Sequence, residues 1–451
     1  VGSFSFDAFG KFHLALTSGK DPVWIESSSA ISVALSEERR SLLGLLSPTI
    51  HLESASGGIE HLWMRPITEG FIKGKLFVNN FYTEEGRTYN QGHLTTLSQD
   101  NLVLSGTGIL ENKSLIEART INASMFWLLN SGSIEGHDLT INSGGGFGNS
   151  GSIAMMGKSN ITVPYILNGT FFPDVCPAFL KEKQIKNPTI YSLGGLCIEA
   201  DDVHNDDGIL SGNSKTKITA RKALTNKEGF IGDPESKTCL TLGAFNEKEN
   251  PDFGLLQGER VTFNAIERIL NLGTGNCRAN QIEITAQNLN SKLHFITPHL
   301  FLDIADLQLS NQGLCERTTV LRGPNQDFTL TAPHGTRGSF EIVQKGLSSE
   351  EIQNTLEEKT AVVRDEGDAP ASSHRLSFFA NFSAEGGLNV FAPNAHLHIG
   401  SEADNIRPEM LFLDNNFNAH VNSFELETGS LVALNAMIWA PKSIVTGKLI
   451  R

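Results

Sequence analysis

The chain has 451 residues and a formal net charge of −14, with 39% hydrophobic and 19% charged residues. The apolar content is sufficient for a buried core and argues against general disorder. The negative charge argues against a nucleic-acid partner, because phosphate binding requires a basic surface. No run of eighteen apolar residues occurs, so the sequence predicts no membrane span. The 43 glycines indicate frequent turns and favour an all-β chain.

Residues 1–93 combine strand-like runs, such as Ile31–Leu35, with one predicted helix. Ser36 is a favourable N-cap, acidic residues follow it, and the leucines up to Leu46 form an apolar face. We therefore expect an irregular N-terminal region in this part of the chain. It is a candidate cap, since the end of a repeat architecture needs protection from edge-to-edge association.

Residues 94–347 contain degenerate repeats of about twenty residues that are punctuated by asparagines. An apolar residue lies four positions after each asparagine in the pairs Asn112 and Ile116, Asn130 and Ile134, Asn149 and Ile153, Asn205 and Ile209, and Asn226 and Phe230. Short alternating strands follow at Leu139–Ile141, Ile161–Val163, Ile218–Ala220, Ile284–Ala286 and Leu330–Ala332.

Alternation with a period of two turns one face of each strand inward, and Asn and Gly suit the sharp corners between strands. A single rung of such strands cannot bury its own apolar face, whereas stacked rungs can. The pattern therefore predicts an all-β fold, a right-handed parallel β-helix (solenoid) with short helical insertions.

Two segments carry a resemblance to a known family. The sequences ITARKALTNKEGFI (residues 218–231) and LLNSGSIEGHDLTI (residues 128–141) resemble the haemagglutinin repeat of filamentous haemagglutinin and related contact-dependent-inhibition proteins. The resemblance covers roughly residues 100–335 and recurs weakly in residues 376–451. It implies a long right-handed β-helical rod that is exported by two-partner secretion and displays an adhesin or toxin at a bacterial surface.

Residues 348–373 interrupt the repeats. Ser349–Lys359 has the pattern of a short amphipathic helix, and the charged and then small residues of Arg364–Ser373 indicate a loop. Insertions of this kind leave a solenoid at its corners and often carry binding. Residues 374–451 then return to strand-like runs, which we interpret as C-terminal rungs of the β-helix.

The densest acidic cluster supplies the candidate catalytic residues of an alternative, enzymatic interpretation: Asp201, Asp202, Asp206 and Asp207. Together with His204 they have the chemistry for a carboxylate pair that cleaves polysaccharides, or for oxygen ligands to Ca²⁺. We favour a third interpretation, a solvated corner, because Asn205 and Ile209 fit the ordinary repeat pattern.

Histidines and cysteines provide two further candidate sites. His396 and His398 share one strand face, which suits two metal ligands, but no third ligand is evident and we expect a surface pair. The five cysteines are separated by about one or two repeat lengths, mostly too far for disulfides between rungs, so we expect free buried thiols at Cys176, Cys197, Cys239, Cys277 and Cys315.

The sequence predicts a non-enzymatic β-helical rod or adhesin segment of a secreted bacterial surface or toxin-delivery protein, which displays or binds through corner loops. The expected partners are a protein or glycan receptor on another cell, or other segments of the same large assembly, without nucleic acid, cofactor or metal. Because the chain starts at Val1 without a charged and then apolar leader, we interpret it as a fragment or processed product. The alternative is a carbohydrate-active β-helix enzyme or a receptor-binding spike.

Overall fold

The structure is a computed structural model, and it describes residues 4–6, 12–16, 21–36, 39–97, 100–169, 188–243, 252–309, 313–322, 326–330, 334–347, 374–379, 381–400, 410–426, 430–440, 442–445 and 448–450. All regular elements in these ranges are strands. Accordingly, the described part of the chain has no helix that is long and apolar enough to cross a membrane. The chain divides into two compact units, the N-terminal unit (Val1–Lys237) and the C-terminal unit (Thr238–Arg451).

The strands of the N-terminal unit are β1 (Phe4–Phe6), β2 (Phe12–Leu16), β3 (Val23–Glu26), β4 (Ile31–Leu35), β5 (Arg39–Ser54), β6 (Gly58–Thr83), β7 (Arg87–Asn90), β8 (His93–Thr95), β9 (Asn101–Ser105), β10 (Ile109–Asn112), β11 (Leu115–Ser124), β12 (Trp127–Asn130), β13 (Ser133–Asn142), β14 (Gly146–Asn149), β15 (Ser152–Met155), β16 (Lys158–Thr162), β17 (Tyr165–Gly169), β18 (Thr189–Ser192), β19 (Gly195–Asp206), β20 (Ile209–Gly212), β21 (Lys215–Thr225) and β22 (Phe230–Ile231).

The remaining strands begin with β23 at the boundary and continue through the C-terminal unit: β23 (Lys237–Leu242), β24 (Asp252–Ala265), β25 (Ile269–Thr285), β26 (Asn288–Asp303), β27 (Asp306–Leu309), β28 (Leu314–Arg322), β29 (Phe328–Leu330), β30 (His334–Thr336), β31 (Ser339–Gln344), β32 (His374–Phe378), β33 (Phe382–Ala384), β34 (Leu388–Ile399), β35 (Met410–Leu426), β36 (Ser430–Trp439), β37 (Lys442–Val445) and β38 (Lys448–Ile450).

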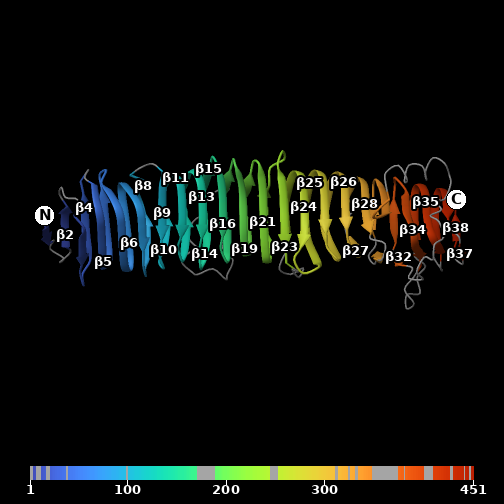
Figure 1. The fold of residues 1–451 in the computed structure, drawn as a ribbon, viewed down its shortest axis with the longest axis horizontal. Helices are drawn as coiled ribbons and strands as arrows, with labels where there is room; N and C mark the ends of the chain where they lie inside the picture. Colours follow the sequence, from blue (N-terminus) through green and yellow to red (C-terminus); the bar gives the residue numbers. More distant parts are fainter. Residues whose placement is uncertain are drawn as a thin grey trace. The chain divides into compact units, whose positions relative to one another are not determined.

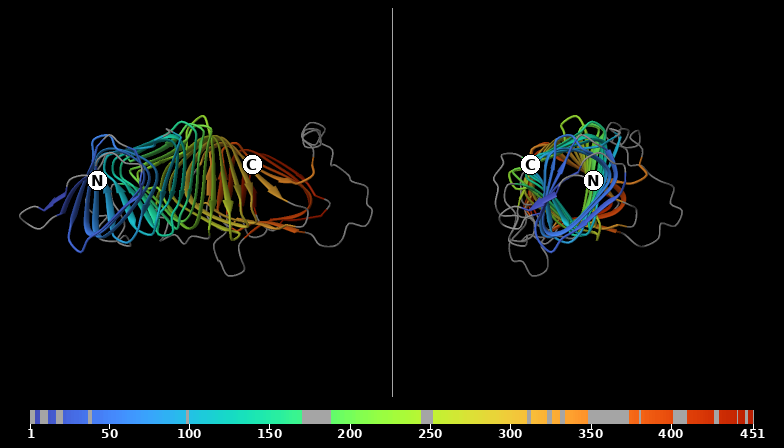
Figure 2. Two further views of the ribbon diagram at one scale, coloured as in Figure 1. Left: turned by 60° about the vertical axis from the view of Figure 1, so that its left-hand side comes forward. Right: turned by 90° about the vertical axis from the view of Figure 1, so that its left-hand side faces the viewer.

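Each unit is a parallel β-solenoid, in which a strand pairs with the equivalent strand one turn earlier and one turn later (Figures 1 and 2). In the N-terminal unit, Trp127 of β12 lies opposite Ile109 of β10 and Gly146 of β14. In the C-terminal unit, β25 lies in parallel between β24 and β26. The described strands make about 17 turns in the two units together. The predicted all-β parallel β-helix is therefore confirmed.

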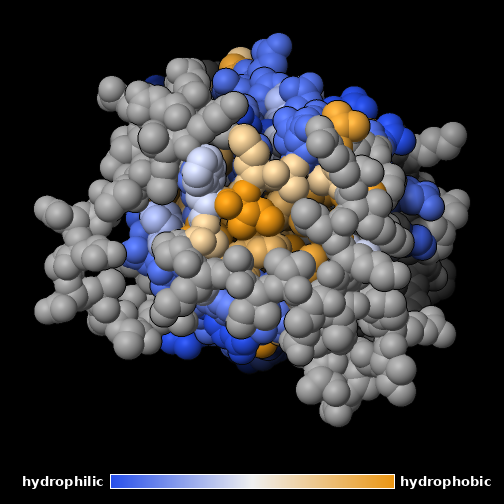
Figure 3. Space-filling model, turned by 90° about the vertical axis from the view of Figure 1, so that its right-hand side faces the viewer, coloured by the Kyte–Doolittle hydropathy of each residue, from blue (hydrophilic) through white to orange (hydrophobic). Residues whose placement is uncertain are grey.

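Inward side chains of successive rungs stack into apolar columns. One column of the N-terminal unit, with exposures of 0 or 1%, consists of Leu76, Leu94, Ile116, Ile134, Ile153, Ile190, Leu210 and Ile231. Burying one such side chain contributes roughly 1.5–3 kcal/mol, so stacking gives every rung a hydrophobic contact that it lacks alone. At the C-terminal end of the chain, Figure 3 shows hydrophobic residues gathered in the middle and hydrophilic residues around them.

The column corrects the predicted repeat pattern at two rungs. Ile209 and Phe230 point outward, and Phe230 is 44% exposed, whereas the next residues, Leu210 and Ile231, are fully buried. The turns before them are one residue longer than the turn after Asn112. Asp207 and Glu228 absorb the extra residue with positive φ angles of 53° and 52°, a conformation that four-residue spacing does not anticipate.

A ladder of buried asparagines runs beside the apolar column. Each side-chain amide nitrogen donates to the side-chain oxygen of the asparagine on the next rung, over 2.5–2.8 Å. The residues of this asparagine ladder, all at most 1% exposed, are Asn90, Asn112, Asn130, Asn149, Asn168, Asn205 and Asn226. The five asparagines that define the predicted repeat belong to it. Because it bonds each rung to the next at this corner, the rungs keep a common register.

The helix predicted at Ser36–Leu46 is wrong. β5 (Arg39–Ser54) covers most of that segment. Its Leu43–Leu46 part pairs in parallel with β3 on one edge and with β6 on the other. Leu43 and Leu45 are both fully buried. The apolar residues of this segment alternate as a strand requires, although they also fit one face of an amphipathic helix. Pairing on both edges outweighs helix propensity, which is a weak preference.

The strands on either side of residues 348–373 pair directly with each other. β29 pairs with β32, and β31 pairs with β34. The C-terminal rungs therefore continue the stack that precedes this segment. The helix predicted at Ser349–Lys359, and the insertion itself, lie outside the described residues.

Candidate functional site

The acidic candidates occupy two separate corners of the N-terminal unit. Asp201 and Asp202 lie where β19 bends, and both backbone N–H groups donate to the carbonyl oxygen of Pro164 at 3.0 Å. Asp206 ends β19, and Asp207 follows it in the next turn. Asp202 and Asp206 are separated by four strand residues, or about 13 Å. Their backbone positions are therefore further apart than the ~6.5–9.5 Å that separates the carboxyl groups of inverting glycosidases.

The charges around these carboxylates also differ between the corners. The Asp201 carboxylate lies 2.9 Å from the ammonium of Lys222 and 3.3 Å from the guanidinium of Arg221. The hydrogen bond from Lys222 is the main reason that the pKa of Asp201 is below its ordinary value. Burial raises the pKa of Asp206 instead. Asp201 therefore belongs to an exposed ion-pair cluster, which is worth little energy.

The two histidine candidates have different surroundings. His396 accepts or donates hydrogen bonds at both ring nitrogens, to Ser423 at 2.6 Å and Glu425 at 3.1 Å. His398 is only 6% exposed, which corrects the expectation of a surface pair, because the ring of Phe379 packs edge-on against it with 5.6 Å between the centroids. In the described ranges no group of three or more His, Cys, Asp or Glu side chains is arranged to hold a metal ion.

The four cysteines that the structure describes carry free thiols. Cys277 and Cys315 are buried, as predicted, whereas Cys197 and Cys239 are only partly buried. Burial raises the pKa of Cys315 to about 12 and raises the pKa of Cys277 even further. Neither buried thiol is therefore a nucleophile at neutral pH. Cys176 lies outside the described residues.

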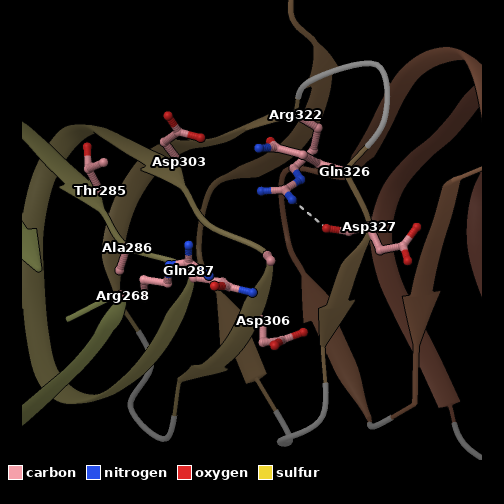
Figure 4. A pocket seen from close by; sticks show the side chains of 10 residues that line it. Arg268, Thr285, Ala286, Gln287, Asp303, Asp306, Arg322, Gln326 and Asp327 are labelled. Carbon is pink, nitrogen blue, oxygen red and sulfur yellow. Dashed lines mark hydrogen bonds between the residues drawn. The ribbon is translucent and has the colours of Figure 1, made fainter. Parts of the chain in front are cut away.

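A groove in the C-terminal unit is a stronger candidate. It encloses about 620 Å³, within the range of small-ligand sites, and follows one corner across successive rungs (Figure 4). The residues that line this corner groove are Arg268, Thr285, Ala286, Gln287, Asp303, Ala305, Asp306, Arg322, Gln326 and Asp327. They come from the turns that precede β25, β26, β27 and β29 and from the strand ends beside these turns.

Backbone hydrogen bonds between rungs fix the shape of the corner groove. The N–H of Gln287 donates to the carbonyl oxygen of Arg268 at 2.7 Å, and the N–H of Ala305 donates to that of Gln287 at 2.7 Å. Arg268 holds a positive φ of 67°, which is uncommon for a residue with a side chain. Alanines at positions 286 and 305 leave space between the longer side chains around them. The groove is thus hollow and preformed.

Arg322 closes one end of the corner groove. It is 2% exposed, yet within the described residues its Nε is buried without a hydrogen-bond partner. A terminal nitrogen of its guanidinium donates to the carbonyl oxygen of Asp327 (Figure 4). Burial lowers the pKa of Arg322, while Asp303, Asp306 and Asp327 oppose this effect. The guanidinium therefore stays charged and has unused hydrogen-bonding capacity.

The sequence pattern does not reveal the corner groove, because the residues that line the groove are separated by whole rungs. Arg268, Gln287 and Asp306 recur at intervals of 19 residues, which is the one signal in the sequence that places them at one corner. The sequence pattern predicts a strand at Ile284–Ala286, but β25 ends at Thr285 and Ala286 lines the groove. Because the predicted strand is one residue too long, it includes a residue that belongs to the corner.

Comparison of the chain with protein-family models, with curated proteins and with solved structures finds no match.

Proposed function

We propose that this chain is a non-enzymatic rod or adhesin segment of a secreted bacterial surface or toxin-delivery protein, and that it binds its partners through its corners. The observation that carries the proposal is the uninterrupted stacking of rungs from β7 to β22 around the asparagine ladder. Such stacking fixes residues on the outer surface at a regular spacing of about 4.8 Å per rung. A scaffold of this kind presents binding groups rigidly.

The repeat resemblance supports the same role. The segment at residues 128–141, which resembles the haemagglutinin repeat, contributes Asn130 and Ile134 to the ladder and the apolar column. The segment at residues 218–231 contributes Asn226 and Ile231 in the same way. The residues that carry the resemblance are therefore those that build the scaffold. They support a structural role more directly than a particular receptor.

Adhesion of the full chain tests the proposal. Beads coated with the folded chain are mixed with erythrocytes, cultured epithelial cells and Gram-negative bacteria, and the cells retained after washing are counted. Beads coated with heat-unfolded chain are the control. We expect retention of at least one cell type by the folded chain only. Equal retention by both kinds of bead, or by neither, would contradict an adhesive role.

The enzymatic alternative has its own readout. The full chain is incubated with a panel of neutral and acidic polysaccharides, and new reducing ends and unsaturated products are measured. We expect none above a heat-treated sample. Release that persists in a variant with Asp201→Asn and Asp206→Asn but disappears with Asp306→Asn would instead assign an enzyme to the corner groove and overturn the non-enzymatic proposal.

A further inference from the structure

The positive and negative side chains of the corner groove balance one another. Three carboxylates and two guanidiniums line it, and the ammonium of Lys345 lies 2.9 Å from the carboxylate of Asp303. Counting these six side chains as charged gives a local sum of zero. A small anion meets the carboxylates and a small cation meets the guanidiniums, so either gains little from entering.

The same side chains suit hydroxyl groups. A hydroxyl donates one hydrogen bond and accepts others, so it satisfies a carboxylate and a guanidinium at once. Asp303 and Asp306, both labelled in Figure 4, offer acceptors, while Arg268 and Gln287 offer donors. Arg322 also lines the groove, and its guanidinium carries N–H donors beyond the one that bonds to the carbonyl oxygen of Asp327.

Exposed apolar side chains lie close to Arg268 in the chain. Ile269 follows it directly and is 43% exposed, and Ile266 precedes it by two positions and is 46% exposed. An exposed isoleucine provides a surface for the face of a sugar ring, which carries C–H groups. The hydroxyl groups of the sugar lie at the edge of the ring. A ligand with an apolar face and a polar edge therefore fits better than a purely polar molecule.

We propose that the corner groove is a binding site for a neutral oligosaccharide. Hydroxyl groups of the sugar bond to Asp306, Arg268 and the Arg322 end of the groove, and one ring face packs on Ile269. The site names a ligand class for the binding role proposed above and rests on that role. No covalent step is involved.

Binding is measured by isothermal titration calorimetry with the full chain and neutral hexasaccharides of glucose, mannose, galactose and N-acetylglucosamine. Oligogalacturonate and spermidine are the anionic and cationic probes. Arg268→Gly removes one guanidinium and suits the positive φ at that position. Ala305→Phe fills the floor of the groove. Arg278→Ala removes an exposed positive charge from β25, away from the groove, and is the matched control.

We expect at least one neutral hexasaccharide to bind, with affinity reduced about tenfold or more by Arg268→Gly, which corresponds to about 1.4 kcal/mol. Ala305→Phe should abolish binding, and Arg278→Ala should leave it unchanged. Far-ultraviolet circular dichroism verifies that each variant is folded. Binding of oligogalacturonate or spermidine alone, no binding of any neutral hexasaccharide, or binding that both groove variants retain would overturn the proposal. Cell retention that survives Ala305→Phe would leave the adhesive role standing without this site.

Discussion

The side-chain amide of Asn112 donates a hydrogen bond of 2.8 Å to the side-chain oxygen of Asn130, one rung further along the solenoid. Asn130 repeats the contact toward Asn149, also at 2.8 Å, and its amide additionally donates to the carbonyl oxygen of Ser152 at 3.2 Å. Each asparagine is thus both donor and acceptor inside the molecule. Removal of one member leaves unsatisfied groups on both neighbouring rungs.

Asn130→Ala should therefore lower the free energy of unfolding of the N-terminal unit by about 2–4 kcal/mol, because buried donors and acceptors lose their partners. The measurement is denaturant unfolding followed by circular dichroism. Asn122→Ala is the matched control, since Asn122 makes an equivalent 2.8 Å contact with Asn101 on the exposed surface. It should change stability by less than about 0.5 kcal/mol. Equal effects of the two substitutions would refute a special contribution from the buried ladder.

A second prediction concerns the glycines under Trp127. A Cβ atom on Gly146 would lie 2.5 Å from the Trp127 ring, whereas one on Gly144 would meet nothing within 4 Å. Trp127 is only 8% exposed, so Gly146→Ala must displace the indole and destabilise the unit by roughly 1–3 kcal/mol. Gly144→Ala should be close to neutral. Near-ultraviolet circular dichroism and denaturant unfolding report on both; an unchanged Gly146→Ala protein would show that the ring has room to move.

The cysteines should differ in reactivity within the native protein. Iodoacetamide at mildly alkaline pH should modify Cys197 and Cys239, which are partly exposed, and spare Cys277 and Cys315, which are buried. The buried pair also has raised pKa values, so little thiolate is present there. Peptide mass spectrometry identifies the modified sites, and all four should react in concentrated guanidinium chloride. Rapid native labelling of Cys277 would mean that its rung opens readily.

Buried histidines should make the C-terminal unit less stable in mild acid. Burial lowers the pKa values of His374 and His420, so the unfolded chain takes up protons near pH 6.5 while the folded chain does not. The free energy of unfolding should therefore fall as pH decreases through about 6.5, until the lowered folded pKa values are reached.

The control for this pH effect replaces both rings with a side chain that cannot titrate. His420 stacks between Phe391 and Trp439, at centroid distances of 6.0 and 5.9 Å, so phenylalanine preserves its contacts. In the double variant His374→Phe and His420→Phe, the difference in stability between about pH 7.5 and pH 5.5 should shrink. A difference as large as in the original protein would assign the acid sensitivity to other groups.

The sequence alone determined the class of fold and most of its repeat. Asn112, Asn130 and Asn149, with apolar residues four positions later, mark stacked corners because a rung must place the same residue types at the same corner each time. Alternation of period two then requires one buried face. Both features depend only on residues close together in the sequence, so each can be recognised within a single segment. The pattern failed by one residue at Ile209 and Phe230, where a positive φ lengthens the turn.

Only the tertiary structure decided the N-terminal strands and the corner groove. The segment that contains Leu43 and Leu45 suits a helix in isolation and becomes a strand because β3 bonds to one of its edges and β6 to the other. Arg268 and Arg322 lie 54 positions apart in the sequence and reach one groove because the chain returns to the same corner after each turn. The local pattern specifies the strands of each rung. The number of residues in each turn decides which side chains of neighbouring rungs come into contact.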